Sequence, residues 1–115
     1  MKKPQSLFPE NYVSMIQNGK IRVDHVTPAL EHSLLGLGGK SVIEGGEIWT
    51  IPYQGQQELA GHLDQLNRIG VLFGGGSGGW PPSAIFEDLR EKGLLHGSFK
   101  EVASTGPGKW FIRDR

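Results

Sequence analysis

The sequence predicts a single α+β domain over residues 1–115, with an antiparallel or mixed sheet of about five strands and helices packed on one face. Three observations support this class. Glycine-containing turns divide β-rich runs into two hairpins, at residues 41–52 and 99–113. Segments in which apolar residues recur at helical spacing lie between and before these hairpins. The length of 115 residues is close to the commonest size of one compact domain.

The composition is rich in glycine but remains that of a folded protein. Glycine supplies 18 of 115 residues, about 16% against a usual share of about 7%. With the 7 prolines, the share stays below the roughly 25–30% that marks low-complexity chains. Leu, Ile, Val and Phe together make about 27% of the chain, above the roughly 20% below which disorder is expected.

The first elements are read from periodicity and from helix-boundary residues. Residues 9–17 are predicted to form a short helix, because their apolar side chains recur at helical spacing before Gly19. Residues 20–26 alternate with a period of two, which predicts a strand. Thr27-Pro28 is a favoured pair for an N-cap and first helical position, so a second short helix should follow and end at a cluster of glycines.

The middle of the chain carries the first hairpin and the clearest helix. Residues 41–44 and 47–52 are β-rich runs around Gly45-Gly46, a pair typical of a tight hairpin turn. Residues 57–69 have a stripe of leucines on one face and opposite charges four residues apart on the other, which predicts an amphipathic helix.

The last part of the chain is predicted to hold a further helix and the second hairpin. Residues 71–73 form a short apolar stub before the glycine-rich run 74–79. A helix is predicted over residues 82–92, and the second hairpin consists of strands at 99–103 and 109–113.

The charges are balanced over the whole chain and within each half. Lys and Arg number 12, Asp and Glu number 12, and the net charge is zero. Nucleic-acid binders usually carry a basic excess, because neutralising phosphate supplies much of their affinity. Nucleic acid is therefore disfavoured as a partner. Zero net charge also removes the repulsion between copies that keeps proteins monomeric, so we expect a homodimer.

Several kinds of site have no support in the sequence. The chain has no cysteine, which excludes disulfides, thiolate nucleophiles and Cys-type zinc sites. The four histidines lack metal-ligand spacing, so we expect no metal, no cofactor and no assignable catalytic residue. No apolar run approaches the ~20 residues of a membrane span, and the N-terminus does not resemble a signal peptide. We therefore expect a cytoplasmic protein without a membrane partner.

The glycine-rich run 74–79 contains the letters of a nucleotide-binding loop. Gly74, Gly76 and Gly79 match G-x-G-x-x-G, but five glycines in six positions also match by chance. No Lys-Ser or Lys-Thr pair follows, which excludes a P-loop. We interpret the run mainly as a connector. The alternative is a loop that lets a ligand or another backbone approach closely.

Trp80 is the aromatic residue best placed to meet a partner. It stands between two glycines and two prolines, and Trp is enriched among interface hot spots. The predicted binding residues are Gly76, Ser77 and Trp80, with Trp49 and Tyr53 as further aromatic candidates. In the alternative interpretation, Trp80 folds back onto the next helix and Trp49 belongs to the core or a sheet face.

The sequence thus favours a small homodimeric binding or interaction protein with a small-molecule or protein partner. One alternative is a winged-helix-like nucleic-acid-binding domain over residues 57–113, although its recognition helix would carry three acidic residues. The other is a small hydrolase or ribonuclease that uses one of two histidines, His25 or His32. Its carboxylate would be Glu44 or Glu47, which flank the Gly-Gly turn.

Overall fold

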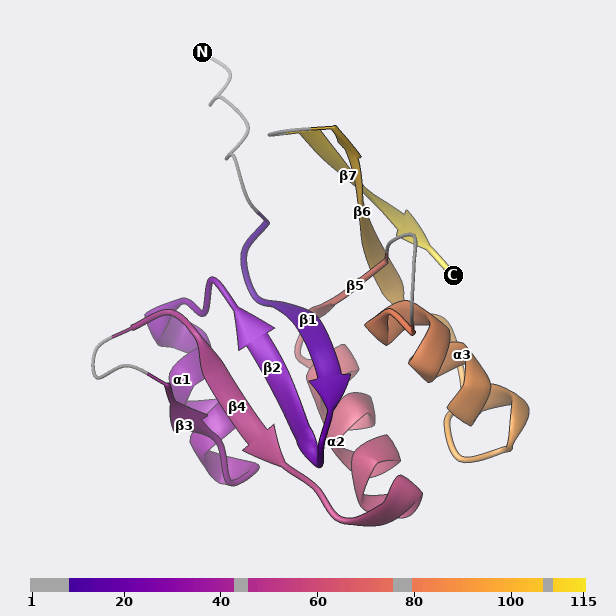
Figure 1. Cartoon of the computed structure of the whole chain (residues 1–115), viewed down its shortest axis with the longest axis horizontal. Coiled ribbons are helices and arrows are strands. Elements are labelled where there is room, and N and C mark those ends of the chain that lie inside the picture. The colour runs from indigo at the N-terminus through magenta and orange to yellow at the C-terminus, as the bar shows by residue number, and fades with distance from the viewer. Residues whose placement is uncertain (1–8, 43–45, 76–79, 107–108) are drawn as a thin grey trace.

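A computed structural model describes residues 9–42, 46–75, 80–106 and 109–115. The elements of this part are β1 (Tyr12–Gln17), β2 (Lys20–Asp24), α1 (Pro28–Gly36), β3 (Lys40–Ser41), β4 (Trp49–Pro52), α2 (Gly55–Arg68), β5 (Leu72–Gly74), α3 (Pro82–Glu91), β6 (Lys100–Gly106) and β7 (Lys109–Asp114). The strands form one mixed sheet in the order β3-β4-β2-β1-β5-β6-β7 (Figure 1). The α+β class is confirmed, with seven strands rather than about five.

The predicted helix at residues 9–17 is wrong, because this segment contains strand β1. A β-bulge between Val13 and Met15 shifts the pairing with β2, so that Val13 and Ile16 both face the core. Two buried residues three positions apart are also what an amphipathic helix shows. The bulge therefore imitates helical spacing in the sequence.

The next two elements follow their local signals. Asn18 and Gly19 have positive φ values of 54° and 74° and form the two-residue turn into β2. Strand β2 confirms the strand predicted over residues 20–26, and α1 begins directly after Thr27. The Thr27 side chain does not cap this helix. Instead, its hydroxyl accepts a hydrogen bond from the Asn11 Nδ2 at 3.1 Å, and its backbone N–H donates to the Asn11 Oδ1 at 2.8 Å.

Both predicted hairpins are present. Strands β3 and β4 pair antiparallel in the hairpin predicted at 41–52, which begins one residue earlier, at Lys40. Residues 43–45 of their connection lie outside the described residues. Strands β6 and β7 pair from Lys100↔Asp114 to Gly106↔Lys109. This confirms the hairpin at 99–113, with residues 107–108 outside the described part.

The centre of the sheet is parallel. Strand β5 pairs parallel with β1 on one side and with β6 on the other. Helix α2 connects β4 to β5 and α3 connects β5 to β6, so both helices act as crossover connections between strands of the same direction. The predicted helices at 57–69 and 82–92 and the stub at 71–73 correspond to α2, α3 and β5.

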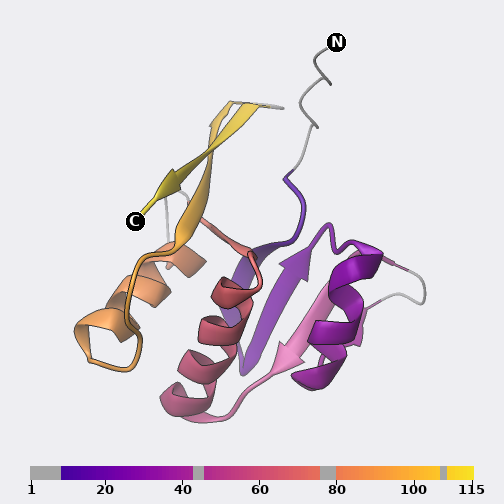
Figure 2. The same ribbon diagram turned by 180° about the vertical axis from the view of Figure 1, so that it is seen from behind.

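The helices pack on one face of this sheet. Val13, Val23 and Phe73 are register partners on neighbouring strands, and all three are fully buried. They belong to one core cluster that includes the leucines of α1 and α2 and Phe86 of α3. Figure 2 shows α1 and α2 in front of the strands on this side. The helices of the described part lack the length and apolar character that crossing a membrane requires.

Candidate binding site

The glycine-rich run begins inside the sheet. Gly74 ends β5, and a Cβ atom at this position would lie 2.9 Å from the carbonyl oxygen of Val13. Gly75 donates its N–H to the Val102 carbonyl at 2.8 Å. A Cβ atom on Gly75 would overlap the carboxylate of Glu101. Close approach of neighbouring groups therefore accounts for the first two glycines, as the alternative interpretation of the run expected.

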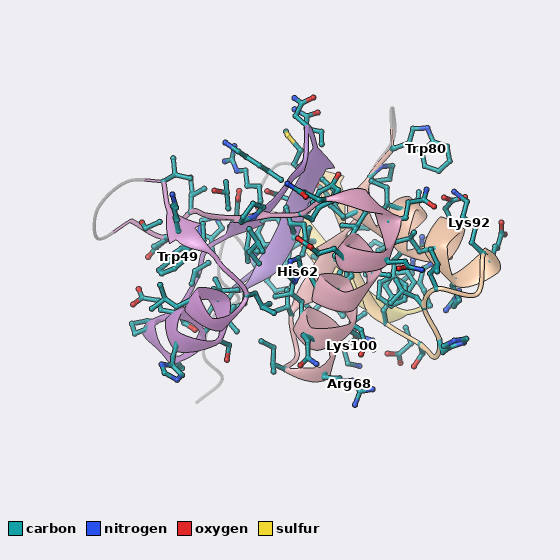
Figure 3. The ribbon with its side chains drawn as sticks, turned by 90° about the horizontal axis from the view of Figure 1, so that it is seen from below. Trp49, His62, Arg68, Trp80, Lys92 and Lys100 are labelled. Carbon is teal, nitrogen blue, oxygen red and sulfur yellow. The ribbon has the colours of Figure 1, made fainter. Side chains whose placement is uncertain are left out.

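Trp80 is the first described residue after this run. Its side chain is 69% exposed, more than any other large apolar side chain in the described part of the chain. Pro81 is the extended N-cap of α3, and Pro82 is the first, buried residue of the helix. Figure 3 shows the indole projecting away from the body of the domain, so it is not covered by α3. Gly76 and Ser77, also predicted as binding residues, lie outside the described residues.

A buried ion cluster lies at the base of this segment. Glu101 is 2% exposed, and its carboxylate accepts bonds from the Arg113 Nε at 2.5 Å and the Arg115 Nη1 at 2.9 Å. The buried Ser83 hydroxyl is a third donor to this carboxylate. Arg115 also forms an ion pair with Glu87 of α3. The cluster thus ties the first turns of α3 to the hairpin of β6 and β7.

The cluster holds Glu101 in its ionised form. Burial by itself raises the pKa of the Glu101 carboxyl, but the hydrogen bonds from Ser83 and Arg113 and the charges of Arg115 and Arg113 outweigh it. The pKa of Glu101 therefore lies below its ordinary value of 4.5. The carboxylate is buried and accepts bonds from three donors, so we interpret its role as structural, with its partners orienting α3.

This lowered pKa makes the domain acid-sensitive. A carboxyl whose folded-state pKa is depressed stabilises the fold above its unfolded-state pKa, and the contribution is lost as the pH falls through the folded-state pKa. We expect the difference in free energy of unfolding between wild type and Glu101→Gln to be constant above about pH 5.5 and to shrink below about pH 4.5. Urea titrations of both proteins from neutral pH to about pH 3 measure it. A difference independent of pH would contradict this assignment.

Sequence reasoning missed this cluster, although a signal was present. Phe99 and Glu101 are two residues apart in a predicted strand, so they share a face, and Phe99 is a core residue. A charged residue on the inward face of a strand requires a partner. The hairpin predicted at 99–113 places Arg113 directly opposite Glu101, as the structure shows.

Trp49 and Tyr53 do not join Trp80. Trp49 is 6% exposed within the core cluster, and its indole N–H has no hydrogen-bond partner among the described residues. Tyr53 is half-buried after β4 and donates its backbone N–H to the Gly19 carbonyl at 2.9 Å. Figure 3 shows Trp49 and Trp80 at opposite sides of α2. Of the predicted binding residues that the structure describes, Trp80 alone is presented to solvent.

The residues of the hydrolase alternative are partly brought together. The His25 Nδ1 lies 3.5 Å from the Glu47 carboxylate, and both side chains are accessible, at 33% and 71%. The Tyr12 ring stacks on His25 with 5.9 Å between ring centroids. His32 is exposed on α1, and Glu44 lies outside the described residues. Two cavities of the described part, of about 140 and 290 Å³, are lined by other residues.

The elements are not arranged as the winged-helix alternative requires. Helices α2 and α3 are separated by β5, which pairs on both sides within the sheet. Helix α3 buries Phe86 and Leu89 against the core and carries the acidic residues Glu87, Asp88 and Glu91 toward its other sides. A helix with these charges repels phosphate.

In the described part of the chain, no cluster of three or more His, Asp or Glu side chains has the arrangement of a metal site. Comparisons of the chain with models of protein families, with curated proteins and with solved structures found no match. The candidate site consists of Trp80 beside the first turn of α3 and the Glu101 cluster.

Proposed function

We propose that this chain is an interaction protein that inserts Trp80 into an apolar pocket of a protein partner. The observation that carries the proposal is the 69% exposure of Trp80 next to buried, tightly held residues. An indole offers a large apolar surface and one hydrogen-bond donor, which is why Trp is enriched among the residues that dominate binding energies. Isolated exposed tryptophans have no comparable role in stabilising a monomer.

The structure supports binding because the base of Trp80 is preorganised. Proline restricts the backbone at the next two positions, and Ser83 is buried against Glu101. A contact residue that is already held in place loses less conformational freedom on binding, so more of its burial appears as affinity. A protein partner is favoured over nucleic acid because the adjoining helix α3 carries three acidic residues, Glu87, Asp88 and Glu91.

Replacing Trp80 with alanine should leave the fold intact. Exposed side chains without specific contacts contribute little, so we expect the free energy of unfolding to change by less than about 0.5 kcal/mol. Urea unfolding measures this change. The fluorescence of the native protein should lose the component that acrylamide quenches most readily, because Trp49 is buried and Trp110 half-buried, whereas Trp80 is exposed. A variant that is destabilised by more than about 1.5 kcal/mol would show that the indole packs on the domain.

The function is tested by photocrosslinking from position 80 in cells that make the protein. A photoreactive phenylalanine analogue at position 80 should give one discrete adduct with another protein. The same analogue at Leu35, which is 59% exposed on α1, is the matched control and should not give that adduct. With the adduct's partner purified, Trp80→Ala should weaken binding about 30-fold or more, and Leu35→Ala should change it less than about twofold. Equal effects of the two substitutions would refute the proposal.

A further inference from the structure

The two edges of the sheet differ sharply. The strands at the ends of the order are β3 and β7. Strand β3 has 2 residues, which is too short to pair with another chain, whereas β7 has 6. Phe111 and Ile112 of β7 are 41% and 45% exposed. A long edge strand with exposed apolar side chains can accept a further strand.

The hydrogen bonds of the hairpin identify which backbone groups of β7 point outward. Phe99 and Arg115 exchange both backbone hydrogen bonds, at 3.2 and 2.8 Å. Bonded and non-bonded pairs alternate along an antiparallel ladder, so Arg113 bonds to β6 and the residues on either side of it do not. The N–H and C=O groups of Ile112 and Asp114 therefore point to the open edge.

We propose that β7 pairs antiparallel with β7 of a second copy of this chain, with Ile112 opposite the partner's Ile112. The proposal is independent of Trp80. Two identical antiparallel strands are related by a two-fold axis perpendicular to the sheet, which passes midway between the two copies of one residue, and for Ile112 this central pair is a bonded one. Registers centred on Phe111 or Arg113 would make the central pair a non-bonded one, and they would place Arg113 opposite the partner's Lys109 or the partner's Arg113, so that like charges meet. A register centred on Asp114 would pair only the end of the strand and oppose two carboxylates.

The Ile112 register suits the side chains of β7. It places Phe111 opposite the partner's Arg113, a pairing of ring and guanidinium that already occurs within one chain at 5.9 Å. It also places Trp110 opposite the partner's Asp114. An aromatic ring therefore faces a charged side chain at each of these positions, and like charges do not meet there.

The charged groups on this edge are compensated within each copy. Arg113 is paired with Glu101, and Asp114 with Lys100 at 2.9 Å. Arg115, which would face the partner's Lys109, is paired with both Glu87 and Glu101. The chain as a whole has zero net charge. Neither local nor long-range repulsion therefore opposes the approach of a second copy.

We expect the pairing to form a dimer and no larger assembly, and we expect its affinity to be weak. A two-fold pair uses both β7 edges, and the remaining β3 edges are short. Pairing of one edge strand buries less than the roughly 1,200–2,000 Å² of stable interfaces. We therefore expect a dissociation constant on the order of 10 µM.

Sedimentation over a range of concentrations tests the dimer with two variants of exposed residues. Ile112→Lys places two ammonium groups opposite each other and should weaken dimerisation at least tenfold. Leu35→Lys, at 59% exposure on α1, is the control and should change the dissociation constant less than about twofold. Figure 1 shows α1 and β7 at opposite ends of the domain. A wild-type protein that stays monomeric at about 1 mM overturns the proposal. The proposal is also overturned if the protein stays monomeric and β7 instead binds a peptide of another protein.

Disulfide crosslinking tests the register, because the chain has no cysteine of its own. The two Cα atoms of a bonded antiparallel pair are about 5.5 Å apart, within the range of a disulfide. Ile112→Cys should therefore form a covalent dimer under mild oxidation much faster than Leu35→Cys. Lys109→Cys would place its two thiols about 20 Å apart and should crosslink no faster than Leu35→Cys. Faster crosslinking at 109 than at 112 overturns the register.

Discussion

Replacing Glu101 with glutamine is expected to lower the free energy of unfolding by about 2–4 kcal/mol at neutral pH. The substitution keeps the shape of the side chain but removes its charge, and it leaves the Arg113 and Arg115 guanidinium groups close together without a counter-ion between them. Breaking a buried ion pair from one side costs more than the pair itself contributes. Because Arg113 is 54% exposed and Arg115 30%, water offsets part of this cost.

Urea unfolding at neutral pH measures the effect, and the same hairpin provides the control. Asp114 pairs with Lys100 on the surface, with side chains 76% and 60% exposed. Asp114→Asn should change the free energy of unfolding by less than about 1 kcal/mol, because exposed ion pairs contribute little. Equal, small effects of the two substitutions would mean that the Glu101 cluster does not hold α3 to the hairpin.

Replacing Gly75 with alanine is expected to cost about 2–3 kcal/mol of stability. The added methyl group would occupy the space of the Glu101 carboxylate, which two arginines and Ser83 hold in place. Either the carboxylate leaves its donors, or the backbone of Gly75 shifts and weakens its hydrogen bond to Val102. Both responses disturb the segment that leads to Trp80.

A double-mutant cycle separates these responses. If the methyl group acts by displacing the carboxylate, the costs of Gly75→Ala and Glu101→Gln are not additive, and the double variant is more stable than their sum predicts. Gly61 of α2 is the control, because a Cβ atom there would meet no heavy atom within 4 Å. Gly61→Ala should stabilise the protein by up to about 1 kcal/mol, since alanine favours the helix. Strict additivity at positions 75 and 101 would show that the two residues do not interact.

Trp80 illustrates how far local sequence could predict the candidate site. The flanking glycines and prolines singled it out, and the structure exposes it. Trp49 could not be distinguished from it by residue type alone. Whether an indole is buried depends on what packs above its strand, and Trp49 lies within the core that α1 and α2 cover. The predicted hairpin already opposed Arg113 to Glu101, but the other two donors, Ser83 of α3 and Arg115, approach the carboxylate only in the tertiary structure.

The sequence by itself determined the elements whose signals are local. Helices α1, α2 and α3 and both hairpins follow from proline and glycine at element boundaries, turn residues and short-range periodicity, which act within a few positions. Tertiary structure alone decided β1 and the parallel pairing of β5. Because of the bulge after Val13, the buried residues of β1 have the sequence spacing of a helix, and only the pairing with β2 identifies the segment as a strand. Strand β5 has only three residues, and its pairing with β1 and β6 depends on crossovers through α2 and α3, which no local pattern specifies.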